Sequence, residues 1–346
     1  MIDLISDTVT LPSHDMLETI FTAQLGDAGR LDAAGRGEDL ATNQLEDLAA
    51  ELTGKEAALF YPTGTMANTS AILAHCPSGS AVLVEAQQHI YVVEKICFRP
   101  DGFQMKPVLY HIKADGSLDL TEFRRQLDGS NIRLVCLENT HNFSGGTCIP
   151  LADMQQVSAL CRERGIPIHL DGARLFNAAE ALQASPKEIV SCCDSVMFCV
   201  SKGLGAPIGS VLCGDAEFIH KAREWRKLLG GTMRQSGIAA ACGTYALKHN
   251  VRRLSEDREN TQLLAKLLEG MKHLKRDPSP QSNILMLDLR DAGIDSRELC
   301  KRLEEHQIRG CVISNDEVRL VFHMGITQAD VYLVAERILE IDRDLG

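Results

Sequence analysis

Short runs of apolar, mostly β-branched residues recur along this sequence, and Gly, Pro, Asn or Asp stands near the ends of each run. Runs of this kind are typical of short strands. The clearest are "AVLVEA" (81–86), "RLVCLEN" (133–139), "IPIHLDGA" (166–173), "SVMFCVS" (195–201) and "GSVLCG" (209–214). Helical patterns lie between them. Because such strands, when separated by helices, form mainly parallel sheets covered on both faces, we predict an α/β fold.

Two of the predicted helices can be placed by their ends. The stretch "TNQLEDLAAELTG" (42–54) predicts a helix capped by Thr42 or Asn43, with Glu46 placed for a capping box and Gly54 at the end. The stretch "TMANTSAILAHC" (65–76) predicts a second helix.

The alternation breaks near residue 277, at "DPSPQSN". Beyond it we predict a strand "ILMLDL" (284–289), a helix "SRELCKRLEEH" (296–306), a strand "EVRLVFH" (317–323) and a helix "QADVYLVAERILEI" (328–341). We therefore expect a large domain over residues 1–250 and a small α+β domain over residues 251–346.

Composition excludes several classes of protein. A net charge of −11 without any run of Lys and Arg argues against a nucleic-acid partner. No stretch approaches the roughly 18 apolar residues that a membrane span needs, and the start "MIDLISDTVT" lacks a signal-peptide pattern. Twelve cysteines without a C-x-x-C pair indicate reduced thiols in a cytoplasmic protein, rather than disulfides or a zinc site.

Lys202 is the one charged residue in the twenty-residue stretch 195–214. It could be a strand-end lysine whose ammonium reaches solvent. A partly desolvated lysine, however, becomes a nucleophile that can form a Schiff base. The surrounding "SKGLGAPIG" resembles a dinucleotide-binding loop, but it leads into another strand rather than a helix, so we do not expect a Rossmann site.

Asp171 ends the predicted strand 166–173, where α/β sheets place ligands. It could cap a turn with Gly172, or form half of a metal site with His169. Neither alternative explains Lys202 at the end of another strand. A carboxylate for a pyridinium nitrogen beside a Schiff-base lysine is what pyridoxal phosphate (PLP) requires. The strand–turn–helix pattern of "YPTGTMANTSAIL" (61–73) would place helix N–H groups around the phosphate.

With these residues together, the chain resembles the L-threonine aldolases, in the β-eliminating-lyase branch of the fold-type I PLP-dependent enzymes. The stretches that carry the resemblance are "SDTVTLP", "GKEAALFYPTGTMAN", "LENTHN", "HLDGARLFNA", "SKGLGAPIGS", "REWRKLLGGTMRQSG" and "VRLVFH". The resemblance implies a mainly parallel sheet sandwiched by helices, with a smaller C-terminal α+β domain and an N-terminal segment that reaches the active site. It also implies a homodimer or homotetramer with shared active sites.

The resemblance further implies roles for individual residues and no metal. Lys202 would form the Schiff base, Asp171 would pair with the pyridine nitrogen and His89 would stack on the ring. The phosphate would be held by Gly64, Thr65 and Ser201, helped by Arg234 from a neighbouring subunit. The substrate carboxylate would be held by Ser6, Arg174 and Arg319, with Arg174 also near the ring oxygen and Lys227 near the site.

Three of these residues also have ordinary structural explanations. His89 alone could be a surface or core histidine, Ser6 could be a cap or turn residue, and Arg319 could point outward from an alternating strand.

The substrate-facing edge departs from the family pattern. The segment 26–42, "GDAGRLDAAGRGEDLAT", is longer and lacks the usual tyrosine, and "KICF" (95–98) replaces a glycine-rich continuation. The loop before "LVCLENTH" lacks a histidine that many relatives place near the substrate hydroxyl. Segment Gly26–Asp39 adds Arg30 and Arg36, which either lie on a solvated loop or reach the site and recognise a negative β-substituent.

We expect retro-aldol cleavage of L-threonine, L-allo-threonine or related L-β-hydroxy-α-amino acids to glycine and an aldehyde. His89 or a bound water would accept the β-hydroxyl proton. The alternatives are another PLP-dependent lyase, a racemase, an aminotransferase, or a PLP-binding protein without catalysis.

Overall fold

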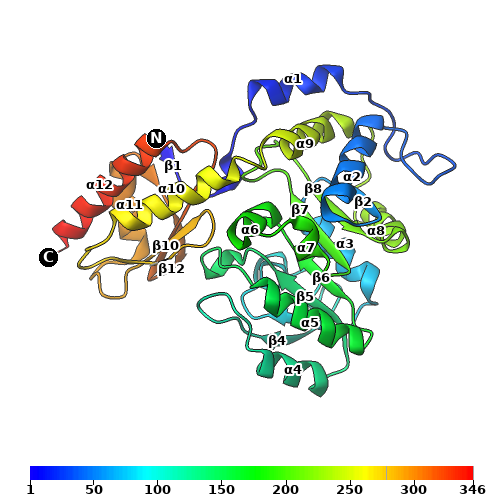
Figure 1. The fold of residues 1–346 in the computed structure, drawn as a ribbon, viewed down its shortest axis with the longest axis horizontal. Helices are drawn as coiled ribbons and strands as arrows, with labels where there is room; N and C mark the ends of the chain where they lie inside the picture. Colours follow the sequence, from blue (N-terminus) through cyan, green and yellow to red (C-terminus); the bar gives the residue numbers. More distant parts are fainter. Residues whose placement is uncertain (278, 346) are drawn as a thin grey trace.

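The computed structural model describes residues 1–277 and 279–345, which form two lobes (Figure 1). Pro278, within the predicted break, and Gly346, at the end of the predicted small domain, lie outside the described residues. The larger lobe contains a seven-stranded sheet and the smaller lobe a four-stranded sheet. None of the helices in residues 1–277 and 279–345 is long and apolar enough to cross a membrane.

The large sheet has the strand order β2-β8-β7-β6-β5-β3-β4. Its strands are β2 (Ala57–Tyr61), β3 (Ala81–Glu85), β4 (Lys106–Tyr110), β5 (Ile132–Glu138), β6 (Ile168–Asp171), β7 (Ser195–Cys199) and β8 (Ser210–Gly214). Strand β8 is antiparallel to both of its neighbours, β2 and β7, and the other pairs of neighbouring strands are parallel. The predicted parallel-rich sheet is therefore confirmed, and the glycine-rich loop around Lys202 joins two strands of that sheet.

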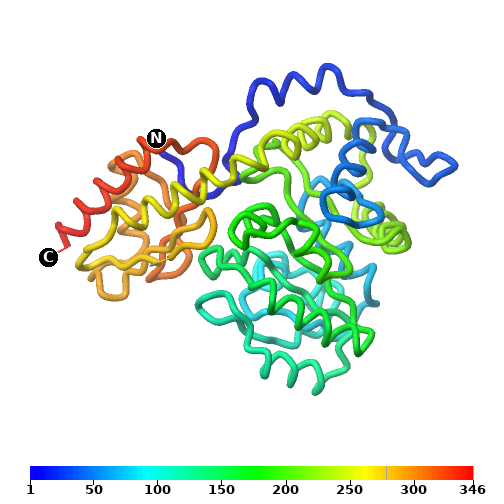
Figure 2. The backbone as a smooth tube through the Cα atoms, in the orientation of Figure 1, coloured from blue at the N-terminus to red at the C-terminus, as the bar shows by residue number. Residues whose placement is uncertain are grey.

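Helices cover both faces of this sheet (Figure 1). The helices of the large lobe are α1 (His14–Thr22), α2 (Leu40–Thr53), α3 (Gly64–His75), α4 (Leu120–Gly129), α5 (Leu151–Glu163), α6 (Leu175–Leu182), α7 (Pro186–Val190), α8 (Ala216–Leu228) and α9 (Gly237–His249). Every residue of β6, β7 and β8 is buried, and most of their side chains are apolar; the polar ones in β6 are His169 and Asp171. Helix α1 lies along the outer side of α9 (Figure 2).

The predicted cap of α2 is wrong, although the helix itself and its end at Gly54 are confirmed. The helix begins two residues earlier, because Asp39 has extended backbone and its carboxylate accepts a hydrogen bond from the N–H of Thr42 (2.8 Å). Glu46 takes no part in a capping box. It is buried and accepts a hydrogen bond from the N–H of Phe60 in β2 (2.9 Å).

The small lobe is an antiparallel sheet of order β12-β13-β10-β9 covered by helices. Its elements are α10 (Leu254–Leu267), β9 (Lys275–Arg276), β10 (Ile284–Asp288), α11 (Ser296–Glu305), β12 (Cys311–Ser314), β13 (Glu317–Val321) and α12 (Gln328–Asp344). The predicted boundary near residue 250 falls between α9 and α10. Helix α10 packs against α6 of the large lobe and α12 of the small one.

The first residues of the chain belong to the small lobe. Strand β1 (Ile2–Asp3) pairs in parallel with β11 (Ile308–Arg309), and Leu4 is buried in the small lobe's core. The chain then crosses to the large lobe through residues 5–13 (Figure 2). This crossing segment passes the carboxyl end of β6, where Asp7 pairs with Arg174.

Asp342 in α12 holds the turn that leads into β9. Its carboxylate accepts hydrogen bonds from the N–H groups of Lys272 (2.8 Å), His273 (2.9 Å) and Leu274 (2.7 Å). Burial raises the pKa of Asp342, but the three hydrogen bonds outweigh burial and leave the pKa below its usual value.

Asp342→Ala should lower the free energy of unfolding at pH 7 by about 2–4 kcal/mol, because three N–H groups lose their acceptor. A carboxyl whose pKa is lowered by folding stabilises the protein above its unfolded-state pKa and loses this effect as the pH falls, so the difference should shrink in acid. Denaturant titration at several pH values measures both effects. Asp344→Ala, on the exposed end of the same helix, is the control and should change stability by less than about 0.5 kcal/mol. Equal stability of Asp342→Ala and wild type at pH 7 would contradict the assignment.

Candidate active site

A cavity of about 430 Å³ opens at the carboxyl ends of β6 and β7, beside the start of α3. It is lined by six of the predicted site residues, namely Gly64, Thr65, His89, Asp171, Ser201 and Lys202. An adjoining cavity of about 130 Å³ shares three of these and adds Ser6, Arg174 and Arg319. Nine of the eleven predicted site residues therefore meet at one edge of the sheet.

Lys202 follows β7 and lines both cavities. Among the described residues, none accepts a hydrogen bond from its ammonium, so the nitrogen is available to a ligand. The loop must be tight here. Gly209 has a φ of +115°, and a Cβ on it would lie 2.3 Å from the ring of Phe60.

Asp171 is buried, and each of its carboxylate oxygens accepts a hydrogen bond. One accepts a hydrogen bond from the N–H of Ala173 (3.0 Å), so the predicted turn contact exists. The other accepts from the amide of Asn68 (3.0 Å). Because a carboxylate oxygen can accept more than one hydrogen bond, Asp171 retains capacity for a ring nitrogen at the cavity wall.

The alternative of a metal site at His169 and Asp171 is not supported. His169 faces Asn68 and Ser195 instead, and burial lowers its pKa to about 3. Ligand atoms of His89, Glu94 and Asp171 do lie within 4.8 Å of one another. However, the amide nitrogen of Asn68 donates to both carboxylates, so a hydrogen-bond donor stands between them where a cation would bind.

His89 is held from two sides. Its ring nitrogen Nδ1 lies 3.0 Å from Glu94, at the end of a single π-helical turn (Ile90–Glu94), and its backbone N–H donates to Glu138 (2.6 Å). Burial disfavours the imidazolium, but the hydrogen bond to Glu94 and the negative charge of Asp171 outweigh burial and raise the pKa of His89. The side chain is 34% exposed, so it is a cavity residue rather than a core histidine.

The start of α3 provides the predicted anion cradle. Thr63 caps the helix by accepting a hydrogen bond from the N–H of Met66 (3.2 Å). In the described part of the chain, the N–H groups of Gly64 and Thr65 have no partner, and both residues line the cavity. A Cβ on Gly64 would lie 2.6 Å from the terminal methyl of Met197, so a larger residue here would require that side chain to move.

Two guanidinium groups converge in the smaller cavity. Asp7 binds Arg174 through two hydrogen bonds (2.7 and 2.8 Å), and Asn142 accepts from both Arg174 (3.1 Å) and Arg319 (2.8 Å). Burial raises the pKa of Asp7, but Arg174 outweighs burial and brings it to about 2. Arg319 is only 7% exposed, so it does not point outward from β13. Ser6, beside them, accepts a hydrogen bond from the N–H of Thr8 and is thus a cap as well.

Two predicted residues lie outside both cavities of their own chain. Lys227 is exposed on α8. Arg234 is 76% exposed and pairs with Asp27 at 3.2 Å. The expectation for Arg234 concerned a neighbouring subunit, and it stays a prediction.

The two arginines of segment Gly26–Asp39 also lie away from their own cavity. Arg30 is 70% exposed and stands 3.9 Å from Glu38, while Arg36 pairs with Asp47 at 2.9 Å. Within a single chain these contacts favour the solvated loop.

Sequence reasoning assigned no role to several polar cavity residues, among them Asn68, Glu94, Glu138 and Asn142. Asn68 lies inside the quoted "TGTMAN" motif and Glu94 directly precedes "KICF".

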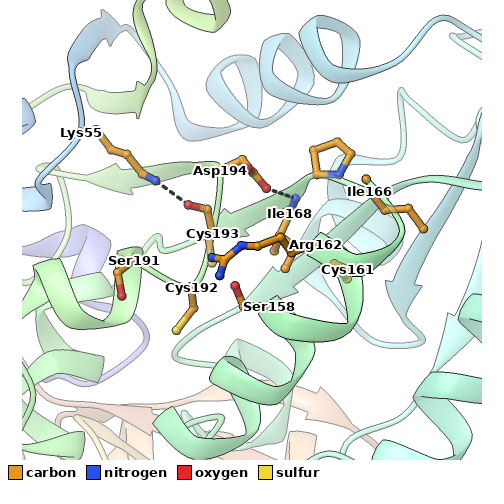
Figure 3. A pocket seen from close by; sticks show the side chains of 12 residues that line it. Lys55, Ser158, Cys161, Arg162, Ile166, Ile168, Ser191, Cys192, Cys193 and Asp194 are labelled. Atoms are coloured by element: carbon orange, nitrogen blue, oxygen red, sulfur yellow. Dashed lines mark hydrogen bonds between the residues drawn. The ribbon is translucent and has the colours of Figure 1, made fainter.

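A second cavity, of about 500 Å³, lies at the opposite, amino ends of β6 and β7 (Figure 3). Lys55 donates to the carbonyl of Cys193 there, and Asp194 accepts from the N–H of Ile168 (2.7 Å). Burial raises the pKa of the Cys193 thiol, so that thiol is not an activated nucleophile. Because this cavity contains none of the predicted site residues, we place the active site at the carboxyl edge of the sheet.

Comparisons with known proteins agree with this site. The sequence profile described as beta-eliminating lyase matches residues 3–292. The low specificity L-threonine aldolase of Escherichia coli K12 is 40% identical over 342 residues, covering 97% of either chain. The low-specificity L-threonine aldolase 1 of Arabidopsis thaliana is 38% identical over 341 residues, covering 96% of this chain and 93% of that one.

The solved structure of a Leishmania major threonine aldolase matches all of this chain with a TM-score of 0.81 at 19% identity, which shows the shared fold. The resemblance to the L-threonine aldolases and the fold-type I architecture are thus confirmed. A family profile and curated relatives that match most of the sequence lead to one assignment: this chain belongs to the beta-eliminating lyase family.

Proposed function

We propose that this protein is a PLP-dependent aldehyde-lyase that cleaves L-threonine, L-allo-threonine or related L-β-hydroxy-α-amino acids to glycine and an aldehyde. One observation carries the proposal. Lys202, whose ammonium has no partner among the described residues, and Asp171 line the larger cavity, and Arg174 and Arg319 line the adjoining one. The curated relatives named as low-specificity L-threonine aldolases support the same activity.

The residues at the larger cavity fit PLP. Lys202 would hold it covalently, Asp171 would hold a proton at the ring nitrogen and His89 would cover the ring. The open N–H groups of Gly64 and Thr65, with Ser201, would bind the phosphate. When bound, the cofactor supplies an electron sink for the bond that breaks.

The smaller cavity would hold the substrate carboxylate. Arg174 and Arg319 already point their N–H groups at one acceptor, the amide oxygen of Asn142, so a carboxylate can replace or join it. Fixing the carboxylate also fixes rotation about Cα, and the Cα–Cβ bond can then be aligned with the cofactor's π system.

A base must accept the β-hydroxyl proton before the Cα–Cβ bond breaks. His89 is the candidate among the described residues, because Glu94 occupies only its Nδ1 and leaves Nε2 for the substrate. A water held at the cavity is the alternative. A different bond could also break at the same site, giving elimination, racemisation or transamination, and product analysis with L-threonine, L-serine and L-alanine separates these reactions.

We further infer a cytoplasmic homodimer or homotetramer with shared active sites. Exposed apolar side chains near α1, namely Leu11 (81%), Phe21 (89%) and Leu25 (44%), favour a partner surface there. Arg234, exposed in its own chain, is available to a neighbouring site. Twelve free thiols, ten of them buried, suit a reducing compartment.

Borohydride treatment of the PLP-loaded protein should fix the cofactor to Lys202, and peptide mass spectrometry locates the attachment. Lys202→Ala should lose both the attachment and the visible absorption band, because no other lysine of residues 1–277 and 279–345 lines the two cavities. Lys221→Ala, on the exposed face of α8, is the control and should keep both. Attachment at another lysine in wild type would remove Lys202 from its proposed role.

Arg319→Ala should lower kcat/KM for L-threonine by about 30- to 1000-fold, because a buried cation that pairs with the substrate carboxylate is lost. Steady-state kinetics should place much of the effect in KM, since the carboxylate stays bound throughout the reaction. Arg343→Ala, exposed on α12, is the matched control. Unchanged kinetics in Arg319→Ala would show that the carboxylate binds elsewhere.

The sequence led us to propose that Arg30 or Arg36 reaches the site; because neither reaches the cavity of its own chain, we now propose the site of a neighbouring subunit. If one of them binds a negative β-substituent, wild type should prefer L-3-hydroxyaspartate over L-threonine and L-phenylserine by about 10- to 150-fold in kcat/KM. Arg30→Ala or Arg36→Ala should then remove that preference. A preference for threonine that both variants share would assign the segment to a solvated loop.

A further inference from the structure

Asn68 binds both carboxylates behind the active site. It lies in the second turn of α3 and is 1% exposed. Its amide nitrogen stands 3.0 Å from Asp171 Oδ2 and 3.1 Å from Glu94 Oε1. Since a primary amide has two N–H bonds, one can be donated to each carboxylate. Glu94 in turn binds the ring of His89, so one amide is connected to two groups proposed to hold the cofactor ring.

A buried chain of polar groups holds Asn68 from the other side. Its oxygen lies 3.0 Å from His169 Nε2, and His169 Nδ1 lies 2.9 Å from the hydroxyl of Ser195. That hydroxyl lies 2.7 Å from His75 Nε2. The chain crosses from α3 to β6, to β7 and back to the end of α3, and it touches neither active-site cavity beyond Asn68.

The donors in this chain all point the same way. Burial lowers the pKa of His169 to about 3 and that of His75 to about 4, so both rings are neutral near pH 7. Each neutral ring has one N–H. The Asn68 oxygen can only accept, so His169 must donate from Nε2 and accept at Nδ1 from the Ser195 hydroxyl. Ser195 then accepts from His75.

This order has two consequences. The amide of Asn68 cannot turn over, because its oxygen would then face two carboxylates and its NH₂ would face the His169 donor. The amide also has no proton that it can readily release, so the chain stabilises the charge of Asp171 without relaying a proton to it.

We propose that Asn68, locked by His169, Ser195 and His75, is the positioning residue that fixes Asp171 and, through Glu94, His89 toward the cofactor ring. This inference rests on the proposed PLP site, but not on which bond of the substrate breaks. An apolar residue at position 68 would fill the same space without donating to either carboxylate. This substitution should therefore change the protonation of the ring nitrogen and the affinity for PLP, and not only the stability of the protein.

The test uses the full-length protein loaded with PLP that carries ¹⁵N at the ring nitrogen. Asn68→Leu removes the amide while keeping a side chain of similar size. Ser195→Ala breaks the chain of hydrogen bonds at a residue that is separated from Asp171 by His169 and Asn68. Ser296→Ala is the control, since Ser296 is equally buried in the small lobe and its hydroxyl makes one hydrogen bond, to the carbonyl of Ser314. The readouts are the ¹⁵N resonance, the PLP dissociation constant from equilibrium dialysis and the melting temperature.

Asn68→Leu should move the ¹⁵N resonance toward the unprotonated ring, because a carboxylate that has lost a donor binds the shared proton more tightly. It should also weaken PLP binding by about 10- to 100-fold. Ser195→Ala should cause a smaller change in the same direction, and Ser296→Ala none. If Asn68→Leu does not fold, Ser195→Ala decides alone. Wild-type resonance and wild-type PLP affinity in Ser195→Ala and in any folded Asn68→Leu, with only the melting temperature lowered, would overturn the proposal.

The same samples separate this inference from the proposed function. A wild-type protein with a protonated ring nitrogen that yields no glycine from β-hydroxy amino acids would contradict the proposed reaction alone. Normal aldol cleavage with an unaltered ¹⁵N resonance in Ser195→Ala and in any folded Asn68→Leu would contradict the positioning role alone.

Discussion

The ion pair between Asp7 and Arg174 joins the parts of the chain that form the active site. Asp7 lies on the segment that crosses from the small lobe, and Arg174 follows β6 of the large sheet. Removing two charges from water is costly, and their attraction compensates only when the geometry and the remaining hydrogen bonds are good. Here the pair is bidentate, Asn283 stands 3.4 Å from Asp7, and Asn142 accepts from Arg174. The two lobes are thus held together by the groups that orient Arg174, the arginine proposed to bind the substrate carboxylate.

The same arrangement separates the cationic and anionic ends of the site. Arg174 and Arg319 lie together, and burial together with the charge of Arg174 lowers the pKa of Arg319. Asp171 and Glu94 lie together on the other side, separated by the Asn68 amide. A ligand with a carboxylate at one end and a protonated ring nitrogen at the other matches this polarity. An amino acid bound beside PLP, with its carboxylate at the two arginines and the cofactor ring nitrogen at Asp171, would have that form.

The sequence could predict the framework because its signals are local. Most side chains of the buried strands are apolar, and the turn before α3 contains a capping threonine and a glycine. The cap of α2 was missed because Asp39, Thr42 and Asn43 are all good caps, and only the course of the preceding loop selects among them. Glu46 was misassigned because its partner Phe60 is brought close by tertiary packing.

The site was predictable to the extent that single residues have chemistry of their own. Lys202 and Asp171 could be found in this way. Asn68 could not, because its role depends on Glu94, His169 and Ser195, which are far apart in the sequence. The part played by the first residues in the small lobe was hidden for the same reason: β1 has only two residues and its partner lies some three hundred residues away.

The segment "KICF" (95–98), one of the departures from the family pattern, directly follows the π-helical turn that contains Glu94. Lys95, the first residue of "KICF", has a φ of +58°, a conformation that suits glycine and that other residues adopt at a cost of roughly 1 kcal/mol. Its N–H donates to the carbonyl of Ile90 (3.2 Å), which closes the π-helical turn. That turn places Glu94 against both His89 and Asn68. Position 95 can therefore hold a residue other than glycine while Glu94 stays in contact with His89 and Asn68, the two groups proposed to act on the cofactor ring.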